Sequence, residues 1–135
     1  MNLKQKCKEI SMALAANLLV LFAMVLVMRP SFETNDDIVF AELGSGLRGV
    51  KDAHLVFQNY GLGMIYRFLY AVTGRLPWYT IFQYVILLVA FTAVTYVLIN
   101  RLEGISGLCL SLILVCGFGY EGYIHLQFTK TAGIA

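Results

Sequence analysis

The chain has 135 residues, of which 59% are hydrophobic and only 13% are charged. Soluble domains carry about 25% charged residues, so this composition excludes a nucleic-acid-binding domain, a disordered chain and a secreted disulfide scaffold. The net charge of +2 is too small to imply an anionic partner. The composition therefore predicts an all-α integral membrane protein. A spanning helix takes about 20 residues, so about three spans fit this length.

The first apolar segment covers residues 10–28 and is predicted to span the membrane. Lys4, Lys6 and Lys8 precede it, and positive charge marks the cytoplasmic side of a membrane. We therefore place the N-terminus in the cytoplasm. Asn17 lies in the middle of this segment, where we expect its side chain to hydrogen-bond to a neighbouring helix.

A long loop, residues 29–77, holds most of the charge and faces outward in this topology. Its sequence predicts two short helices. The first follows Thr34-Asn35-Asp36-Asp37 and ends at Gly44-Ser45-Gly46, which are typical cap and stop residues. The second, over residues 62–72, is amphipathic and too short to span, so we expect it at the outer membrane surface or leading into the next span.

Two further spans are predicted over residues 78–99 and 105–119, joined by a tight cytoplasmic turn. Gly107 and Ser111 form a pair of small residues that suits close packing of helices. Residues 120–135 resemble the start of a fourth helix. We interpret residues 1–135 as one membrane module and expect it to be incomplete.

The adjacent carboxylates Asp36 and Asp37 are the main candidates for catalysis. A carboxylate at the outer membrane surface can act as a general base toward an acceptor hydroxyl. Two carboxylates could instead hold a divalent metal such as Mg or Mn, helped by Glu42 or His54. The structural alternative is a capping box formed by Thr34 and Asp37, with both acidic residues favoured by the helix dipole. Both interpretations remain open from the spacing alone.

Cations in the same loop are candidates for binding a phosphate near the lipid headgroups: Arg48, Lys51 and Arg67, with Arg75 as a fourth. The alternative is that each is an ordinary interfacial cation. Arg67 stands out because it interrupts an otherwise apolar helix. Six tyrosines near the predicted span ends are expected to form an interfacial aromatic belt, with a platform for stacking a sugar as the alternative. They are Tyr66, Tyr70, Tyr79, Tyr84, Tyr120 and Tyr123.

The order of these features resembles the N-terminal part of the GT-C type membrane glycosyltransferases, and within them the bacterial relatives of the protein mannosyltransferases. The resemblance rests on the Lys-rich start, the first span, the acidic pair Asp36-Asp37, the long outer loop, the Pro-Trp-Tyr entry at residues 77–79 and the Phe-Thr-Lys-Thr-Ala stretch at residues 128–132. It covers essentially all 135 residues.

The resemblance implies an inverting transfer of a sugar from a polyprenyl-phosphate donor to an acceptor hydroxyl. Asp36 would be the catalytic base with Asp37 beside it, and Arg48, Lys51 or Arg67 would bind the donor phosphate. The resemblance assigns no definite cofactor, and a divalent metal, Mg or Mn, at Asp36 and Asp37 stays open. We expect a protein of the plasma (inner) membrane with loop 29–77 outside.

The chain departs from the family in its length, because such enzymes have eight or more spans. The resemblance therefore implies missing C-terminal spans or a partner membrane subunit, in addition to the lipid-linked donor, and no nucleic acid. The alternative interpretation is a small three-span protein that acts in membrane interaction or assembly without catalysis. The short length and the pair Gly107 and Ser111 favour this alternative.

Overall fold

The computed structural model of the protein describes residues 2–55, 57–102 and 105–135. In chain order its elements are α1 (Leu3–Val27), β1 (Ser31–Phe32), α2 (Asn35–Ser45), α3 (Tyr60–Val72), α4 (Trp78–Arg101), α5 (Ile105–Gly119), the π-helix η1 (Tyr120–Ile124), β2 (His125–Leu126) and α6 (Phe128–Ile134). The predicted all-α class is confirmed, since the strands within these described ranges are two residues long.

Three helices are long and apolar enough to cross a membrane: Leu3–Val27, Trp78–Arg101 and the continuous segment Ile105–Ile124. The prediction of an integral membrane protein with three spans is therefore confirmed. The first helix begins well before residue 10, because Asn2 caps it and accepts a hydrogen bond from the Lys4 amide at 3.4 Å. Lysine is also a good helix former, so the polar start does not interrupt the helix.

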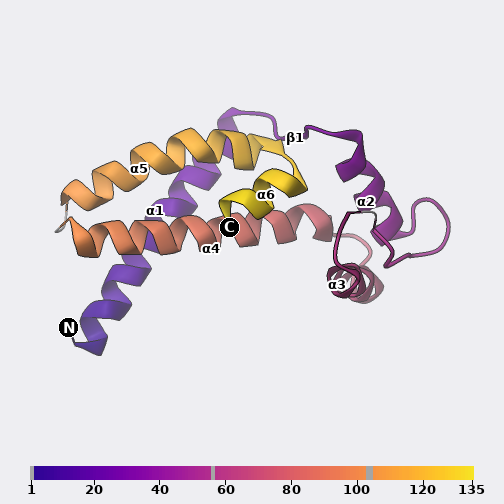
Figure 1. The fold of residues 1–135 in the computed structure, drawn as a ribbon, viewed down its shortest axis with the longest axis horizontal. Coiled ribbons are helices and arrows are strands. Elements are labelled where there is room, and N and C mark those ends of the chain that lie inside the picture. The colour runs from indigo at the N-terminus through magenta and orange to yellow at the C-terminus, as the bar shows by residue number, and fades with distance from the viewer. Residues whose placement is uncertain (1, 56, 103–104) are drawn as a thin grey trace.

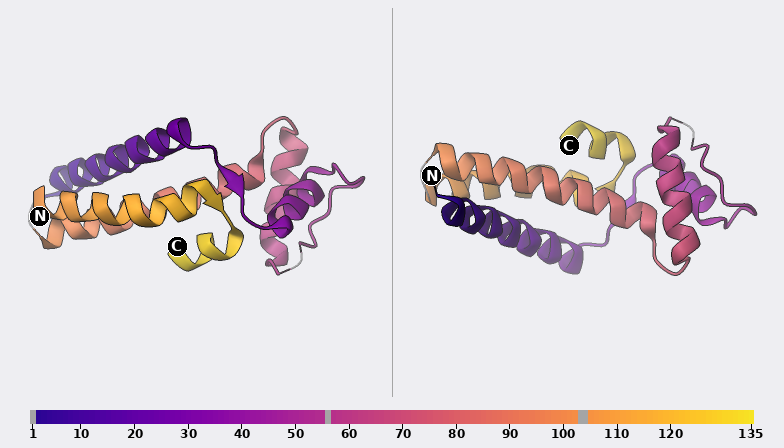
Figure 2. Two further views of the ribbon diagram at one scale, coloured as in Figure 1. Left: turned by 90° about the horizontal axis from the view of Figure 1, so that it is seen from above. Right: turned by 90° about the horizontal axis from the view of Figure 1, so that it is seen from below.

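The three long helices form a bundle with different structures at its two ends (Figure 1). Helices α4 and α5 run antiparallel side by side, and α1 crosses them. The N-terminus lies at the same end as the last turn of α4 and the first turn of α5, whereas α2 and α3 lie at the opposite end (Figure 2). We call this second end the loop end. Helix α6 turns back from it along α4 (Figure 2).

A buried hydrogen bond joins α1 to α4 within the bundle. The Asn17 side-chain nitrogen donates to Thr95 Oγ1 at 3.0 Å and to the Ala13 carbonyl at 2.8 Å. Asn17 and Thr95 are each only 1% exposed. The expectation that Asn17 bonds to a neighbouring helix is confirmed.

Helix α5 packs against α4 through small residues. Gly107 is buried, and a Cβ atom placed on it would lie only 2.3 Å from the Leu98 carbonyl oxygen of α4. Ser111, one turn later, is fully buried. The predicted role of this pair in close helix packing is confirmed, and the partner is a helix of the same chain.

The loop end is folded around an aromatic core. The two predicted short helices are confirmed as α2 and α3, and α2 ends at Gly46, which adopts the left-handed conformation with φ 83°. The expected aromatic belt is wrong for Tyr66, Tyr70, Tyr79 and Tyr123, which are 4% exposed or less. The packing of α2 and α3 on the end of α4 buries the first three rings, whereas Tyr123 is buried inside the bundle against Leu87, Phe91 and Val115. Periodicity along the sequence does not reveal such packing.

We expect Gly107→Ala to destabilise the bundle, because its new methyl group would overlap the α4 backbone and force the helices apart. Overpacking of this kind costs about 1–3 kcal/mol. Thermal unfolding in detergent micelles measures the effect. Gly117→Ala is the matched control in the same helix, since a Cβ there has no neighbour within 4 Å. Equal unfolding temperatures for the two variants would contradict the close contact.

Candidate functional site

The acidic pair lies in the first turn of α2, at the loop end of the bundle. Successive residues of a helix point about 100° apart, so the two neighbours face different surroundings at the edge of the core. Asp37 faces inward and is fully buried, whereas Asp36 is exposed. The structure thus separates the two carboxylates that the sequence presents as one pair.

The Asp37 carboxylate accepts three hydrogen bonds from different parts of the chain. Its Oδ1 atom accepts from the Tyr79 hydroxyl at 2.8 Å and from the Phe128 amide at 3.0 Å. Its Oδ2 atom accepts from the Thr34 hydroxyl at 2.6 Å. Asp37 therefore fastens the starts of α2, α4 and α6 to one another.

The expected capping box does not form, although Thr34 occupies the cap position of α2. The Thr34 side chain makes no capping hydrogen bond, because its hydroxyl donates to Asp37 instead. Asp37 in turn serves α6, whose own cap residue Gln127 also makes no side-chain capping bond. The Phe128 amide is one of the unpaired donors at that helix start, and Asp37 satisfies it across the fold.

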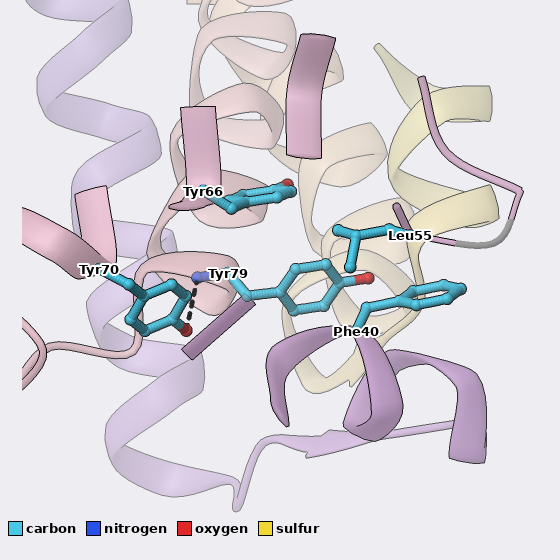
Figure 3. Packing of buried hydrophobic residues seen from close by; sticks show 5 residues of the cluster. All are labelled: Phe40, Leu55, Tyr66, Tyr70 and Tyr79. Atoms are coloured by element: carbon cyan, nitrogen blue, oxygen red, sulfur yellow. Dashed lines mark hydrogen bonds between the residues drawn. The ribbon is translucent and has the colours of Figure 1, made fainter. Parts of the chain in front are cut away.

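Aromatic rings lie around the Tyr79 side chain (Figure 3), whose hydroxyl donates to Asp37. The Tyr79 ring lies between Tyr66 and Phe40, with ring centres 5.3 Å and 6.3 Å away. The Tyr70 hydroxyl accepts a hydrogen bond from the Tyr79 amide at 3.2 Å. Burial raises the pKa of Tyr66, and the nearby Tyr70 and Asp37 raise it further, so Tyr66 remains a neutral phenol.

Asp36 is left available on the surface beside this network. Within the described ranges no side-chain hydrogen bond or ion pair holds its carboxylate. It lies one helical turn before Phe40, whose ring packs against Phe128 of α6 at 5.3 Å between centres. Asp36 therefore projects from a helix end that is fixed by its buried neighbour.

The candidate phosphate-binding cations already have protein partners or stand apart. Arg48 pairs with Glu42, with 2.6 Å between Nε and Oε2, in an exposed contact. The Lys51 ammonium donates to the Tyr70 carbonyl at 2.9 Å. Arg67 lies on the exposed face of α3. Exposed ion pairs contribute little stability, so Arg48 can exchange its partner at low cost.

The residues proposed to help hold a metal do not join the acidic pair. Glu42 contacts Arg48, and His54 Nδ1 lies 2.8 Å from Asp52 Oδ1. The His54 backbone amide and ring both bond to Asp52 and lower the pKa of that carboxyl. Throughout the part of the chain that the structure describes, no three His, Cys, Asp or Glu side chains gather as a metal site.

Lys130 is a charged residue that the sequence gives no reason to single out. Its ammonium group contacts both Glu33, just after β1, and Glu121 of η1. These two carboxylates raise the pKa of Lys130 above its ordinary value. The parallel pairing of β1 with β2, which joins Ser31 to His125, brings the three residues together.

Two hollows flank the aromatic core. The larger, about 430 Å³, lies on the side of α2 that carries Glu42 and also borders Arg75 and Thr80. The smaller, about 290 Å³, is lined by residues of α3, α4 and α6 and by the segment before α3. Phe128, which donates to Asp37, borders the smaller hollow.

Comparisons of the chain with known protein families, with curated proteins and with solved structures find no match. The site must therefore be interpreted from its own geometry and chemistry.

We expect Asp37→Asn to destabilise the fold and Asp36→Asn to leave its stability unchanged. The first variant replaces an acceptor of three hydrogen bonds by an amide that accepts with one atom only. Hydrogen bonds to a charged group contribute about 1.5–3 kcal/mol each, so the loss should reach about 2 kcal/mol. Thermal unfolding in detergent measures both variants. Equal losses would contradict the division of the pair into a buried and an exposed member.

We also expect the contacts of Lys130 to produce a pH-dependent stability. Its pKa is raised in the folded state, so its stabilising effect is present below the ordinary lysine pKa and disappears as the pH rises through the raised value. Lys130→Met should therefore flatten the alkaline side of the stability profile, whereas Lys130→Arg should retain stability there. Unfolding temperatures measured in detergent from pH 8 to 12 test this. Parallel profiles for wild type and Lys130→Met would contradict it.

Proposed function

We propose that this chain is the N-terminal module of a membrane glycosyltransferase, which transfers a sugar from a polyprenyl-phosphate donor to an acceptor hydroxyl at the outer membrane face. One observation carries the proposal. At the end of a bundle of apolar helices, Asp37 fixes the start of α2 through three hydrogen bonds, and the adjacent Asp36 carboxylate stays exposed.

Asp36 has the properties that a general base needs. It is a carboxylate on a helix, and its position is set by a buried neighbour instead of by a mobile loop. In the proposed reaction Asp36 accepts the proton of the acceptor hydroxyl. The acceptor oxygen then bonds to the anomeric carbon, and the bond from that carbon to the lipid phosphate oxygen breaks. The phosphate leaves with the electron pair, and the configuration at the anomeric carbon is inverted.

The charge distribution supports an outward orientation of the loop end. Lys4, Lys6 and Lys8 lie near the N-terminus, and Arg101 ends α4 at the same end of the bundle. Because cytoplasmic segments carry an excess of Lys and Arg, this end faces the cytoplasm in our proposal. Asp36 then lies on the outer face of the plasma (inner) membrane, where lipid-linked sugars are presented.

The leaving phosphate needs cations, and the loop offers several. Arg67 is exposed on α3 and available without rearrangement. Arg48 and Lys51 would exchange Glu42 and the Tyr70 carbonyl for the phosphate. Arg67 is therefore our first candidate for binding the donor phosphate, and Arg48 and Lys51 are the next two candidates. Further spans or a partner membrane subunit would complete the donor and acceptor sites.

The alternative function is that of a small membrane protein which assembles with a partner and has no catalytic role. The pair Gly107 and Ser111 no longer favours it, because these residues pack on α4 of the same chain. A different observation does. A groove of about 430 Å³ between α1 and α4 is lined by apolar side chains such as Ile10, Leu14 and Val89, and a helix of a partner protein would fit there.

The proposal predicts that Asp36→Asn lowers sugar transfer by at least about 100-fold, which is the lower end of the contribution of a general base. The measurement is transfer of radiolabelled sugar from a polyprenyl-phosphate donor, in membranes of source cells whose own gene is replaced by the variant. Asp52→Asn is the matched control, because Asp52 is an exposed carboxylate of the same loop. Normal transfer by Asp36→Asn would overturn the proposal. Cross-linking of α1 to a larger membrane protein, with full function in that variant, would favour the alternative.

A further inference from the structure

The smaller hollow at the loop end has the features of a binding site. It measures about 290 Å³ and lies between the segment before α3, α3 itself, α4 and α6. Aromatic rings of Phe57, Tyr66 and Phe128 line it together with the side-chain amides of Gln58 and Gln83. Phe57 is 79% exposed and adopts a φ of 66°, which is a strained conformation for a residue with a side chain.

Each of the two amides has one atom without a hydrogen-bond partner. Gln83 is only 3% exposed; its Oε1 accepts from the Thr131 hydroxyl at 2.9 Å, but its Nε2 has no partner. Gln58 donates from Nε2 to the Tyr79 hydroxyl at 3.1 Å, and its Oε1 has no partner. A buried polar atom without a partner costs about 1–3 kcal/mol, and folded proteins tolerate few of them.

The network around Asp37 fixes the orientation of the Gln58 amide. The single proton of the Tyr79 hydroxyl is donated to Asp37, so this hydroxyl can only accept from Gln58. Gln58 must therefore present its Nε2 to Tyr79 and its oxygen elsewhere. Turning the Gln83 amide over would only change which of its two atoms is unpaired. In either case each of the two amides that border the hollow keeps one buried atom without a partner.

The lining defines the chemistry of a ligand. Among the described residues, no Asp, Glu, Lys or Arg side chain borders the hollow, so it suits an uncharged group and not a phosphate or a carboxylate. A hydroxyl group can donate its proton to Gln58 and accept a hydrogen bond from the Gln83 amide nitrogen, whereas a Gln83 oxygen in that place would need a second hydroxyl. The aromatic rings provide apolar faces against which the C–H groups of a ligand ring can pack. These properties together fit an uncharged, hydroxyl-bearing ring.

We propose that this hollow binds a neutral sugar ring through the side-chain amides of Gln58 and Gln83. The assignment of the ligand as a sugar rests on the proposed glycosyltransferase function. The hollow is joined to the acidic pair in two ways. Gln58 bonds to Tyr79, which bonds to Asp37, and Phe128 both borders the hollow and donates to Asp37. A bound sugar would therefore contact the network that positions Asp36.

The test is binding of uncharged methyl glycosides, such as methyl mannoside and methyl glucoside, to the full chain in lipid nanodiscs. Saturation-transfer NMR detects the weak binding expected of a single sugar ring. The Gln58→Met and Gln83→Met variants keep the side-chain volume and remove the amides. We expect each to lower the affinity about tenfold, which corresponds to the loss of one hydrogen bond.

Two controls separate loss of the site from general damage. Tyr84→Phe removes a hydrogen bond of the same helix, from the Tyr84 hydroxyl to the Tyr123 carbonyl at 3.0 Å, and should bind the glycoside normally. Gln83→Met should unfold at a temperature close to that of wild type, because removal of the buried unpaired nitrogen offsets the loss of the acceptor for the Thr131 hydroxyl. Unchanged glycoside affinity in both methionine variants would overturn the proposal.

A further probe and a further variant complete the experiment. Absence of glycoside binding by the wild type at millimolar concentrations would overturn the proposal. Binding of an uncharged peptide probe, N-acetylalanine methylamide, in place of the glycosides would overturn it as well. Asp36→Asn should retain glycoside binding while transfer is lost. Binding without any transfer would therefore refute the catalytic function alone, and Asp36-dependent transfer without glycoside binding would refute the hollow alone.

Discussion

The buried carboxylate of Asp37 holds the loop end of this protein together. It accepts hydrogen bonds from a threonine before α2, from a tyrosine in the first turn of α4 and from the first amide of α6. A charge removed from water is costly unless its lone pairs are satisfied, and here three donors satisfy them. The other contacts between these helices are mostly apolar and allow several relative positions. The charge of Asp37 is accommodated in only one of these positions, which therefore sets the orientation of the helix ends.

The division of the acidic pair follows from helix geometry together with this constraint. Asp37 is buried, and the preceding residue points about 100° away, which in this helix is toward solvent. The position of Asp36 is consequently fixed by the core, although among the described residues its own carboxylate makes no side-chain hydrogen bond or ion pair. A side chain that is fixed through its backbone and open at its tip is suited to reaction with a second molecule. A pair of exposed carboxylates on a mobile loop would be less well defined.

Much of the fold follows from local patterns in the sequence. The apolar segments predict three spans, Gly44-Ser45-Gly46 predicts the end of α2, and the pair Gly107 and Ser111 predicts close packing of α5. The partners of Asp37 could not be predicted in this way, because Phe128 lies 91 positions away along the chain. The tyrosines were misinterpreted for the same reason. Tyr79 is an aromatic residue at the start of a predicted span, as interfacial residues often are. Only the packing of α2 and α3 turns its ring inward.

The hydrogen bonds of the loop end are distributed unevenly, and this unevenness indicates where binding would occur. Asp37, Thr34 and Tyr79 satisfy one another, so the structural part of the network is complete. The unpaired atoms lie one step outward, on Gln58 and Gln83, where both border the same hollow. Methionine or leucine at these positions would avoid the cost of buried unpaired amides. Their presence is easier to explain if the hollow is completed by a polar group from another molecule, because the cost is then removed on binding. In this view the loop end has a complete structural network centred on Asp37 and an incomplete one that faces a ligand.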